Sequence, residues 1–164
     1  MTIRIICGIM IENDVGGNVM KFYGVGVKLG ATTENPINIL DECIERDIWY
    51  MGFKEGEKEN YEDIISHIKV GDIIFAKSLH QATKEQMKIK AVGFVTDKMI
   101  PDEFRVNQCI AVYWFKRFEP YVNLKYMGIN FITGINRRNT IFEETDDRII
   151  KQIIRLSKGG HYEN

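Results

Sequence analysis

Features that are common in secreted, membrane and metal-binding proteins are scarce in this sequence of 164 residues. Its three cysteines, Cys7, Cys43 and Cys109, are odd in number and widely separated, which indicates neither a disulfide framework nor a zinc site. No apolar run approaches the ~20 residues that a membrane-spanning helix needs. We therefore expect a cytoplasmic globular protein with reduced thiols and no contact with a membrane.

Sequence signatures of enzymes are also missing. The histidines His67, His80 and His161 occur singly, without a cysteine or carboxylate at the spacing of metal ligands. There is no phosphate-binding loop, nucleophile elbow or His-Glu-x-x-His pattern. Asp72 and Lys77 in "DIIFAK" are only loosely similar to the acid and lysine of a metal-dependent nuclease. We expect a non-catalytic protein with no cofactor and no metal, and a metal-dependent nuclease is the weakest of the alternatives.

The charge is small in total but unevenly distributed. The net charge is −1, yet residues 28–72 hold 11 acidic and 5 basic side chains, whereas residues 73–164 hold 10 acidic and 15 basic ones. Such an asymmetry permits a basic face on a nearly neutral protein, as in a weak nucleic-acid binder. An ordinary solvated surface is the alternative.

The apolar patterns predict strands and three short helices. Residues 3–29 favour a hairpin or two paired strands around the turn "ENDVGGN", and residues 72–78, 88–97, 108–119 and 131–145 favour further strands. Helices are predicted in "NPINILDECIERDIW", in "ENYEDIISHIKVGD" and in "DDRIIKQIIRLSKGG". Gly93, inside a predicted strand, indicates tight curvature or a close neighbour.

Chain length and the spacing of these elements favour one domain over residues 1–164, with a frayed tail from about residue 159. The expected class is α+β: a small curled sheet or barrel of about six or seven strands with about three flanking helices.

Six short segments occur in an order that resembles the EVE-like branch of the PUA superfamily. They are "FYGVGV", "IWYMGF", "IKVGDIIFAKS", "MKIKAVGFVTD", "AVYWF" and "RRNTIF", and the likeness covers about residues 20–145. It is greatest to the DNA-reading domains that precede the motor of modification-dependent restriction AAA+ proteins. The resemblance implies a curled β-barrel that accepts a flipped, often modified, base in an aromatic pocket. Relatives in the superfamily bind RNA, so the partner is DNA or RNA.

A base pocket of this kind needs more than one ring. Extruding a base from a duplex costs a few kcal/mol, and stacking returns ~1–3 kcal/mol per base. We therefore expect two rings on one concave surface, with polar groups at a strand end; packing of the same rings in the core is the alternative. The expected base-pocket residues are Trp49, Tyr50, Phe53, Lys77, Ser78 and Trp114.

Basic and polar residues elsewhere could hold phosphates. The expected backbone-binding residues are Lys84, Lys88, Lys90, Arg137, Arg138, Asn139 and Thr140, although a solvated strand face and an ordinary polar turn would explain them too. A separate protein partner could supply a motor or nuclease. The alternative function is a protein-interaction or regulatory subunit, docked through residues 28–72 or the last helix.

Overall fold

A six-stranded sheet is the centre of the structure, which is a computed structural model describing residues 3–6, 9–12, 19–30, 33–54, 56–79, 86–105, 107–125 and 128–159. The strand order is β10-β3-β7-β8-β9-β6. β3 and β7 are parallel, and every other neighbouring pair is antiparallel. The strands are β3 (Phe22–Gly26), β6 (Ile48–Lys54), β7 (Ile73–Leu79), β8 (Gln86–Val95), β9 (Asn107–Lys125) and β10 (Ile141–Glu144).

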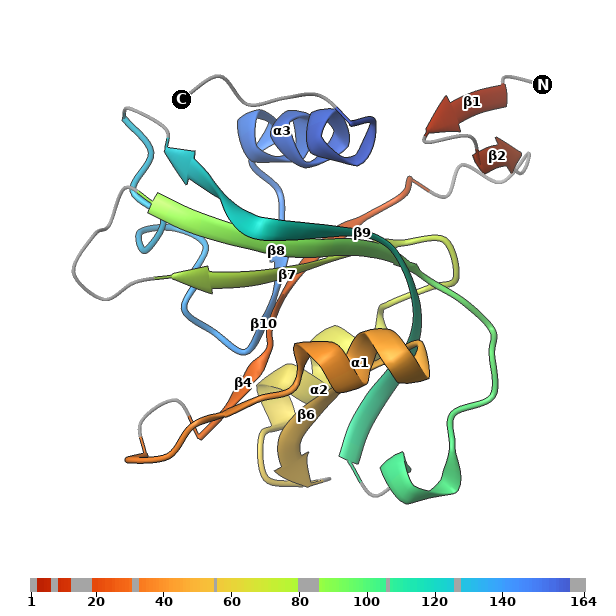
Figure 1. Cartoon of the computed structure of the whole chain (residues 1–164), viewed down its shortest axis with the longest axis vertical. Helices are drawn as coiled ribbons and strands as arrows, with labels where there is room; N and C mark the ends of the chain where they lie inside the picture. The colour runs from red at the N-terminus through yellow and green to blue at the C-terminus, as the bar shows by residue number, and fades with distance from the viewer. Residues whose placement is uncertain are drawn as a thin grey trace.

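The 19-residue strand β9 curls the sheet into a half-barrel. Its first part, up to Ala111, pairs with β6, and the part from Val112 onward pairs with β8. Figure 1 shows β9 bending from the upper part of the sheet down to β6. Shifts of register in both pairings mark β-bulges, which increase local twist and curvature.

Three helices cover the two faces of the sheet. Helices α1 (Leu40–Arg46) and α2 (Glu59–Ser66) lie on one face, and α3 (Asp147–Ser157) lies on the other (Figure 1). A single 3-10 turn, η1 (Asp102–Phe104), precedes β9. The expected α+β class, with a curled sheet and three helices, is confirmed. None of the helices in the described part of the chain has both the length and the apolar character to cross a bilayer.

Alternation along the strands produces two hydrophobic cores. In β7, Ile74 and Ala76 belong to a first core shared with α1 and β6, while Ile73 and Phe75 belong to a second core shared with α3. Successive side chains of a strand point to opposite faces, so a strand covered on both sides is apolar throughout. The unbroken apolar run "IIFA" at the start of β7 reflects this position.

The expected first helix begins later and ends earlier than its sequence pattern indicates. Ile37 lies in β5 (Ile37–Asn38), which pairs with β4 (Lys28–Leu29), and the helix begins at Leu40. Asp47 adopts a left-handed conformation with φ 54° and ends the helix. Trp49 therefore lies in β6 and not at the end of a helix. Strand pairing overrides a helical periodicity that is real but short.

Two strand expectations also need correction. Residues 3–29 form a hairpin only as far as β1 (Ile3–Ile6) and β2 (Ile9–Glu12), because β3 pairs with β7 and β10. In the region 131–145 only β10 is a strand, and the residues before it form a loop over the second core. The last helix agrees with the prediction: the side chain of Asp146 accepts a hydrogen bond from the Arg148 backbone N–H and caps α3.

Candidate functional site

The two indole rings expected in a base pocket lie in the first core. Trp49 exposes none of its surface and Trp114 exposes 9%. The Nε1 of Trp49 donates to the backbone oxygen of Gly26 at 2.8 Å, and the Nε1 of Trp114 donates to that of Ile48 at 2.9 Å. The first bond joins β6 to β3 across the half-barrel. This corrects the expectation for both rings, because in this structure neither is open to a planar ligand.

The other two rings of β6 pack against helices and turns. Tyr50 is 8% exposed, its hydroxyl donates to the Glu42 carboxylate at 2.6 Å, and its ring lies 5.1 Å from that of Phe104 between centroids. Burial raises the pKa of the Tyr50 phenol, and the hydrogen bond to Glu42 adds to the effect. Phe53 is half-buried, with its ring centroid 6.1 Å from that of Tyr61 in α2. Tyr50 is thus closed, and Phe53 keeps part of its surface.

Lys77 is an internal anchor for the loop that precedes β10. Its Nζ is buried and donates to the backbone oxygens of Arg137 and Asn139 at 2.7 and 2.6 Å. The same nitrogen lies 5.3 Å from the ring centroid of Phe142. Burial lowers the pKa of Lys77 to about 7, since no carboxylate offsets the loss of water. The expected contact of Lys77 with a base is therefore not available in this structure.

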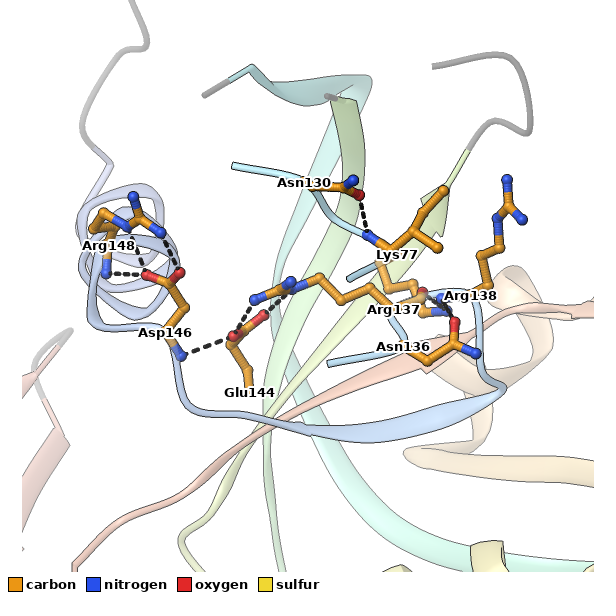
Figure 2. A network of polar contacts seen from close by, with 9 residues as sticks. Lys77, Asn130, Asn136, Arg137, Arg138, Glu144, Asp146 and Arg148 are labelled. Atoms are coloured by element: carbon orange, nitrogen blue, oxygen red, sulfur yellow. Dashed lines mark hydrogen bonds and ion pairs between the residues drawn. The ribbon is translucent and has the colours of Figure 1, made fainter. Parts of the chain in front are cut away.

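Arg137 is committed to a buried ion pair, shown in Figure 2. Its Nε and Nη2 donate to the two carboxylate oxygens of Glu144 at 2.6 and 2.8 Å, and both side chains are buried. The Oε1 of Glu144 also accepts a hydrogen bond from the backbone N–H of Asp146 at 2.9 Å. A hydrogen bond from the Arg148 side chain is the main cause that lowers the pKa of Asp146 to about 2. The network joins the loop to the start of α3, so Arg137 cannot hold a phosphate without breaking it.

The remaining residues of the expected backbone-binding set differ in accessibility. Arg138 is exposed on the same turn, and Asn139 and Thr140 are half-buried beside it. Lys84 lies outside the described residues. Lys88, Lys90 and Ser78 are half-exposed on adjacent strands, and the structure brings these three together.

The face around Lys88 combines positive charge with one open ring. Ser78, Lys88 and Asn123 are direct cross-strand neighbours on β7, β8 and β9. The alternating residues of β8 and β9 pack in the second core, so these polar side chains point to the opposite side. Lys90 and Tyr121 lie on the same side, and Lys28 is close enough to Lys90 for its positive charge to lower the pKa of Lys90. We call this surface the lysine face: Lys28, Ser78, Lys88, Lys90, Tyr121 and Asn123.

Two contacts define the lysine face. The Nζ of Lys88 donates to the Tyr121 hydroxyl at 2.9 Å and lies 4.3 Å from the ring centroid, a cation–π distance. Tyr121 is 43% exposed. Partial burial lowers the pKa of Lys90, and the like charges of Lys28 and Lys88 lower it further.

Within the described part of the chain, the charges of the lysine face are not neutralised by ion pairs. Among the described residues, no salt bridge involves Lys28, Lys88 or Lys90, whereas Lys21 pairs with Glu143 and Lys98 with Asp47. Lysines that repel one another and form no ion pair among the described residues favour the approach of an anion.

Sequence reasoning missed Lys28, Tyr121 and Asn123. In "YVNLK", Val122 and Leu124 alternate with polar residues, a pattern that predicts a strand with one polar face. Extending the predicted strand through this segment would have found Tyr121 and Asn123. Lys28 carries no such signal, because tertiary packing alone brings it near Lys90.

Within the described residues, no group of three histidine, cysteine or carboxylate side chains is placed to hold a metal ion.

No family model and no curated protein matches the chain. Among solved structures, the chain is similar to the YTH domain of the Zygosaccharomyces rouxii MRB1 protein in complex with N6-methyladenosine RNA. The sequence identity is 12%, the match covers 88% of each chain, and the TM-score is 0.47. A functional assignment therefore depends on the residues of this chain.

Proposed function

We propose that this protein is a non-catalytic nucleic-acid-binding domain whose lysine face contacts the phosphate backbone of DNA or RNA. The observation that supports this most directly is the gathering of Lys28, Lys88 and Lys90 beside the open ring of Tyr121, with no carboxylate partner among the residues that the structure describes. A polyanion supplies the missing negative charge and releases its own counterions on binding. A flat base supplies a partner for the ring, worth ~1–3 kcal/mol.

The resemblance to EVE-like domains supports a more specific form of the proposal. In that form the chain tests one base, either unmodified or modified, and reports to a separate protein that supplies a motor or nuclease, as in restriction systems. In this proposal Ser78 keeps its expected place near the base, and Lys88 and Lys90 keep their expected contacts with the phosphate backbone. Arg138, Asn139 and Thr140 extend these phosphate contacts. Tyr121 takes the stacking role expected of the buried indoles.

Binding of labelled oligonucleotides to matched lysine variants tests the proposal. The test variant is Lys28→Ala/Lys90→Ala, and its control is Lys151→Ala/Lys158→Ala, which removes the same charge from exposed positions on and next to α3. Fluorescence anisotropy would be measured with single-stranded and duplex DNA and RNA over a range of salt concentrations. For a single strand, we expect the test variant to bind at least tenfold more weakly at low salt. The slope of log K against log salt should fall in size by about 1.4, or 0.7 for each lost phosphate contact.

Two outcomes would contradict the proposal. One is wild-type binding that does not weaken as salt rises. The other is an equal loss of affinity in the test and control variants, since that would reflect net charge and not the lysine face. Thermal denaturation of each variant confirms that the fold is retained.

A protein-interaction role has one observation in its favour. Tyr113 is 50% exposed, and its ring lies 5.4 Å from that of Phe94, which lies 6.0 Å from that of Phe115. Exposed aromatic clusters are typical of protein interfaces. If Tyr113→Ser abolished a stoichiometric complex with a protein partner and left oligonucleotide affinity unchanged, this role would be established alongside or instead of nucleic-acid binding.

A further inference from the structure

A buried hydrogen-bond acceptor without a partner lies beside the open ring of the lysine face. Asn123 Oδ1 is buried and has no hydrogen-bond partner among the described residues. An unsatisfied buried acceptor costs about 1–3 kcal/mol, so a donor that reached this oxygen would be favoured. Tyr121, two residues earlier on β9 and on the same side of the strand, offers the flat surface on which such a donor-bearing group could stack.

Lys88 lies beside this acceptor and this ring. It is the direct cross-strand neighbour of Asn123, and its Nζ reaches diagonally to the hydroxyl and ring of Tyr121. The side chain therefore starts beside Asn123 and ends over the ring of Tyr121. Its amine has no carboxylate partner in the described part of the chain, and a phosphate forms a stronger, charge-assisted hydrogen bond than a phenol does. A phosphate next to Lys88 would draw the amine away from Tyr121 and leave more of this partly exposed ring for a base.

We infer that the lysine face selects single-stranded nucleic acid, with one unpaired base stacked on Tyr121 and its edge hydrogen-bonded to Asn123 after Lys88 turns to a phosphate. This inference rests on the proposed function and adds the form of the ligand.

The preference for a single strand follows from the number of available rings. Extruding a base from a duplex costs a few kcal/mol, and one ring returns ~1–3 kcal/mol. With Trp49, Trp114 and Tyr50 closed, Tyr121 alone does not balance the extrusion. An unpaired base needs no extrusion, and its hydrogen-bonding edge is free for the amide.

The test compares three probes of equal length: a single-stranded oligonucleotide, the same sequence as a duplex, and a single strand of abasic sites that keeps every phosphate. The variants are Tyr121→Leu, Tyr121→Phe and Asn123→Ala, with Lys28→Ala/Lys90→Ala for the phosphate contacts. Wild-type protein should bind the single strand at least tenfold more tightly than either other probe. Tyr121→Leu and Asn123→Ala should each weaken binding of the single strand at least fivefold and change binding of the abasic strand less than twofold. Tyr121→Phe, which keeps the ring, should stay close to wild type.

The two proposals fail separately in this experiment. If the lysine variant weakens all three probes but wild-type protein binds the abasic strand or the duplex as tightly as the single strand, the base position is wrong and the nucleic-acid proposal stands. If the lysine variant binds every probe as wild type does, the nucleic-acid proposal itself fails. Equal losses for Asn123→Ala on the single and abasic strands would also overturn the base position, because the loss would then reflect local packing.

Discussion

Lys77 and Lys90 show how position decides the role of a residue type. They lie on neighbouring strands, yet Lys77 is buried and holds two backbone oxygens, whereas Lys90 is half-exposed and faces other lysines. The sequence shows a lysine near the end of one apolar strand and another in the middle of the next. Only the sheet register and the loop over the second core assign an internal role to one and a surface role to the other.

Removal of charge from the lysine face should stabilise the fold. Lys90→Gln relieves repulsion with Lys28 and Lys88, so the free energy of unfolding should rise by a few tenths of a kcal/mol at low salt. The gain should shrink at high salt, where the charges are screened. Urea denaturation at two salt concentrations measures both effects, with Lys151→Gln as the control. A lower free energy of unfolding in Lys90→Gln would show that packing of the lysine side chain stabilises the fold more than charge repulsion destabilises it.

Lys77 should give the stability a distinct dependence on pH. Its pKa is about 7 in the folded chain and near its ordinary 10.5 when unfolded. Above about pH 7 the unfolded chain therefore binds more protons, and the free energy of unfolding rises with pH. Between about pH 7 and pH 8.5, below the titration of an unfolded cysteine, wild-type protein should gain stability relative to Lys77→Met. Parallel pH profiles from urea denaturation of the two proteins would contradict this.

The sequence predicted some residues well and others not at all. Gly93 was expected to mark tight curvature or a close neighbour, and a Cβ there would lie 2.6 Å from the Tyr113 backbone oxygen. The sequence also showed the aromatic residues of "IWYMGF", but it did not show which of their rings are buried and which are exposed. Closure of the half-barrel by the Trp49–Gly26 hydrogen bond depends on segments more than 20 residues apart, which no local pattern records.

Local pattern and tertiary pairing compete at the level of elements. Helix α3 was predicted correctly because one strong amphipathic stripe decides it: Ile149, Ile153 and Leu156 are buried and the opposite side is polar. The segment before α1 has the same periodicity over a shorter length, and pairing of β4 with β5 overrides it. Strand β10 was predicted too long, because the loop at 131–140 contains apolar residues that pack on the second core without joining the sheet.

The β8–β9 pairing should not tolerate a side chain at Gly93. A Cβ would lie 2.6 Å from the Tyr113 oxygen and 2.7 Å from Val112 Cγ1, so the two strands would have to separate. Gly93→Ala should lower the free energy of unfolding by about 1–3 kcal/mol or more. Gly26→Ala is the matched control, since its Cβ would meet only ordinary contacts, the nearest at 3.6 Å. Equal midpoints in urea for the two variants would refute the close approach.

The link between the loop and α3 should depend on the charge of Glu144. Glu144→Gln keeps the shape but leaves Arg137 buried without a counterion, and should lower the free energy of unfolding by about 3–5 kcal/mol. Glu143→Gln breaks only the exposed pair with Lys21 and should lose less than about 1 kcal/mol. Arg137→Met/Glu144→Leu should lose much less than the sum of its single variants. Additive losses in urea denaturation would mean that the pair is not coupled.

In the whole molecule, the two faces of the central sheet carry different features. The side with α3 holds the second core and the buried ion pair, and the other side carries the first core and, beyond it, the lysine face. The general architecture follows from composition, length and strand patterns. The lysine face does not, because it joins β4, β7, β8 and β9 from residues 28 to 123.

Ligand binding should stabilise the entire fold. An oligonucleotide at a free concentration of about 100 times its Kd would add about 2.7 kcal/mol to the free energy of unfolding, and raise the Tm by about 5–10 °C. Thermal denaturation with and without a single-stranded oligonucleotide measures the shift. Lys28→Ala/Lys90→Ala should show little shift at the same concentration. A shift of equal size in that variant would place the binding site elsewhere.

The length of β9 has a consequence for how this chain can change by insertion or deletion. Strand β9 carries Trp114 in the interior and Tyr121 on the surface, and its register against β8 shifts between them. Gaining or losing a single residue in a regularly paired part of the strand would reverse the orientation of everything on one side of the change. Either the indole would turn toward water, or Tyr121 and Asn123 would exchange places with Val122 and Leu124. We expect length variation to be confined to the loops at the two ends of this strand and to its β-bulges, where an extra residue is accommodated.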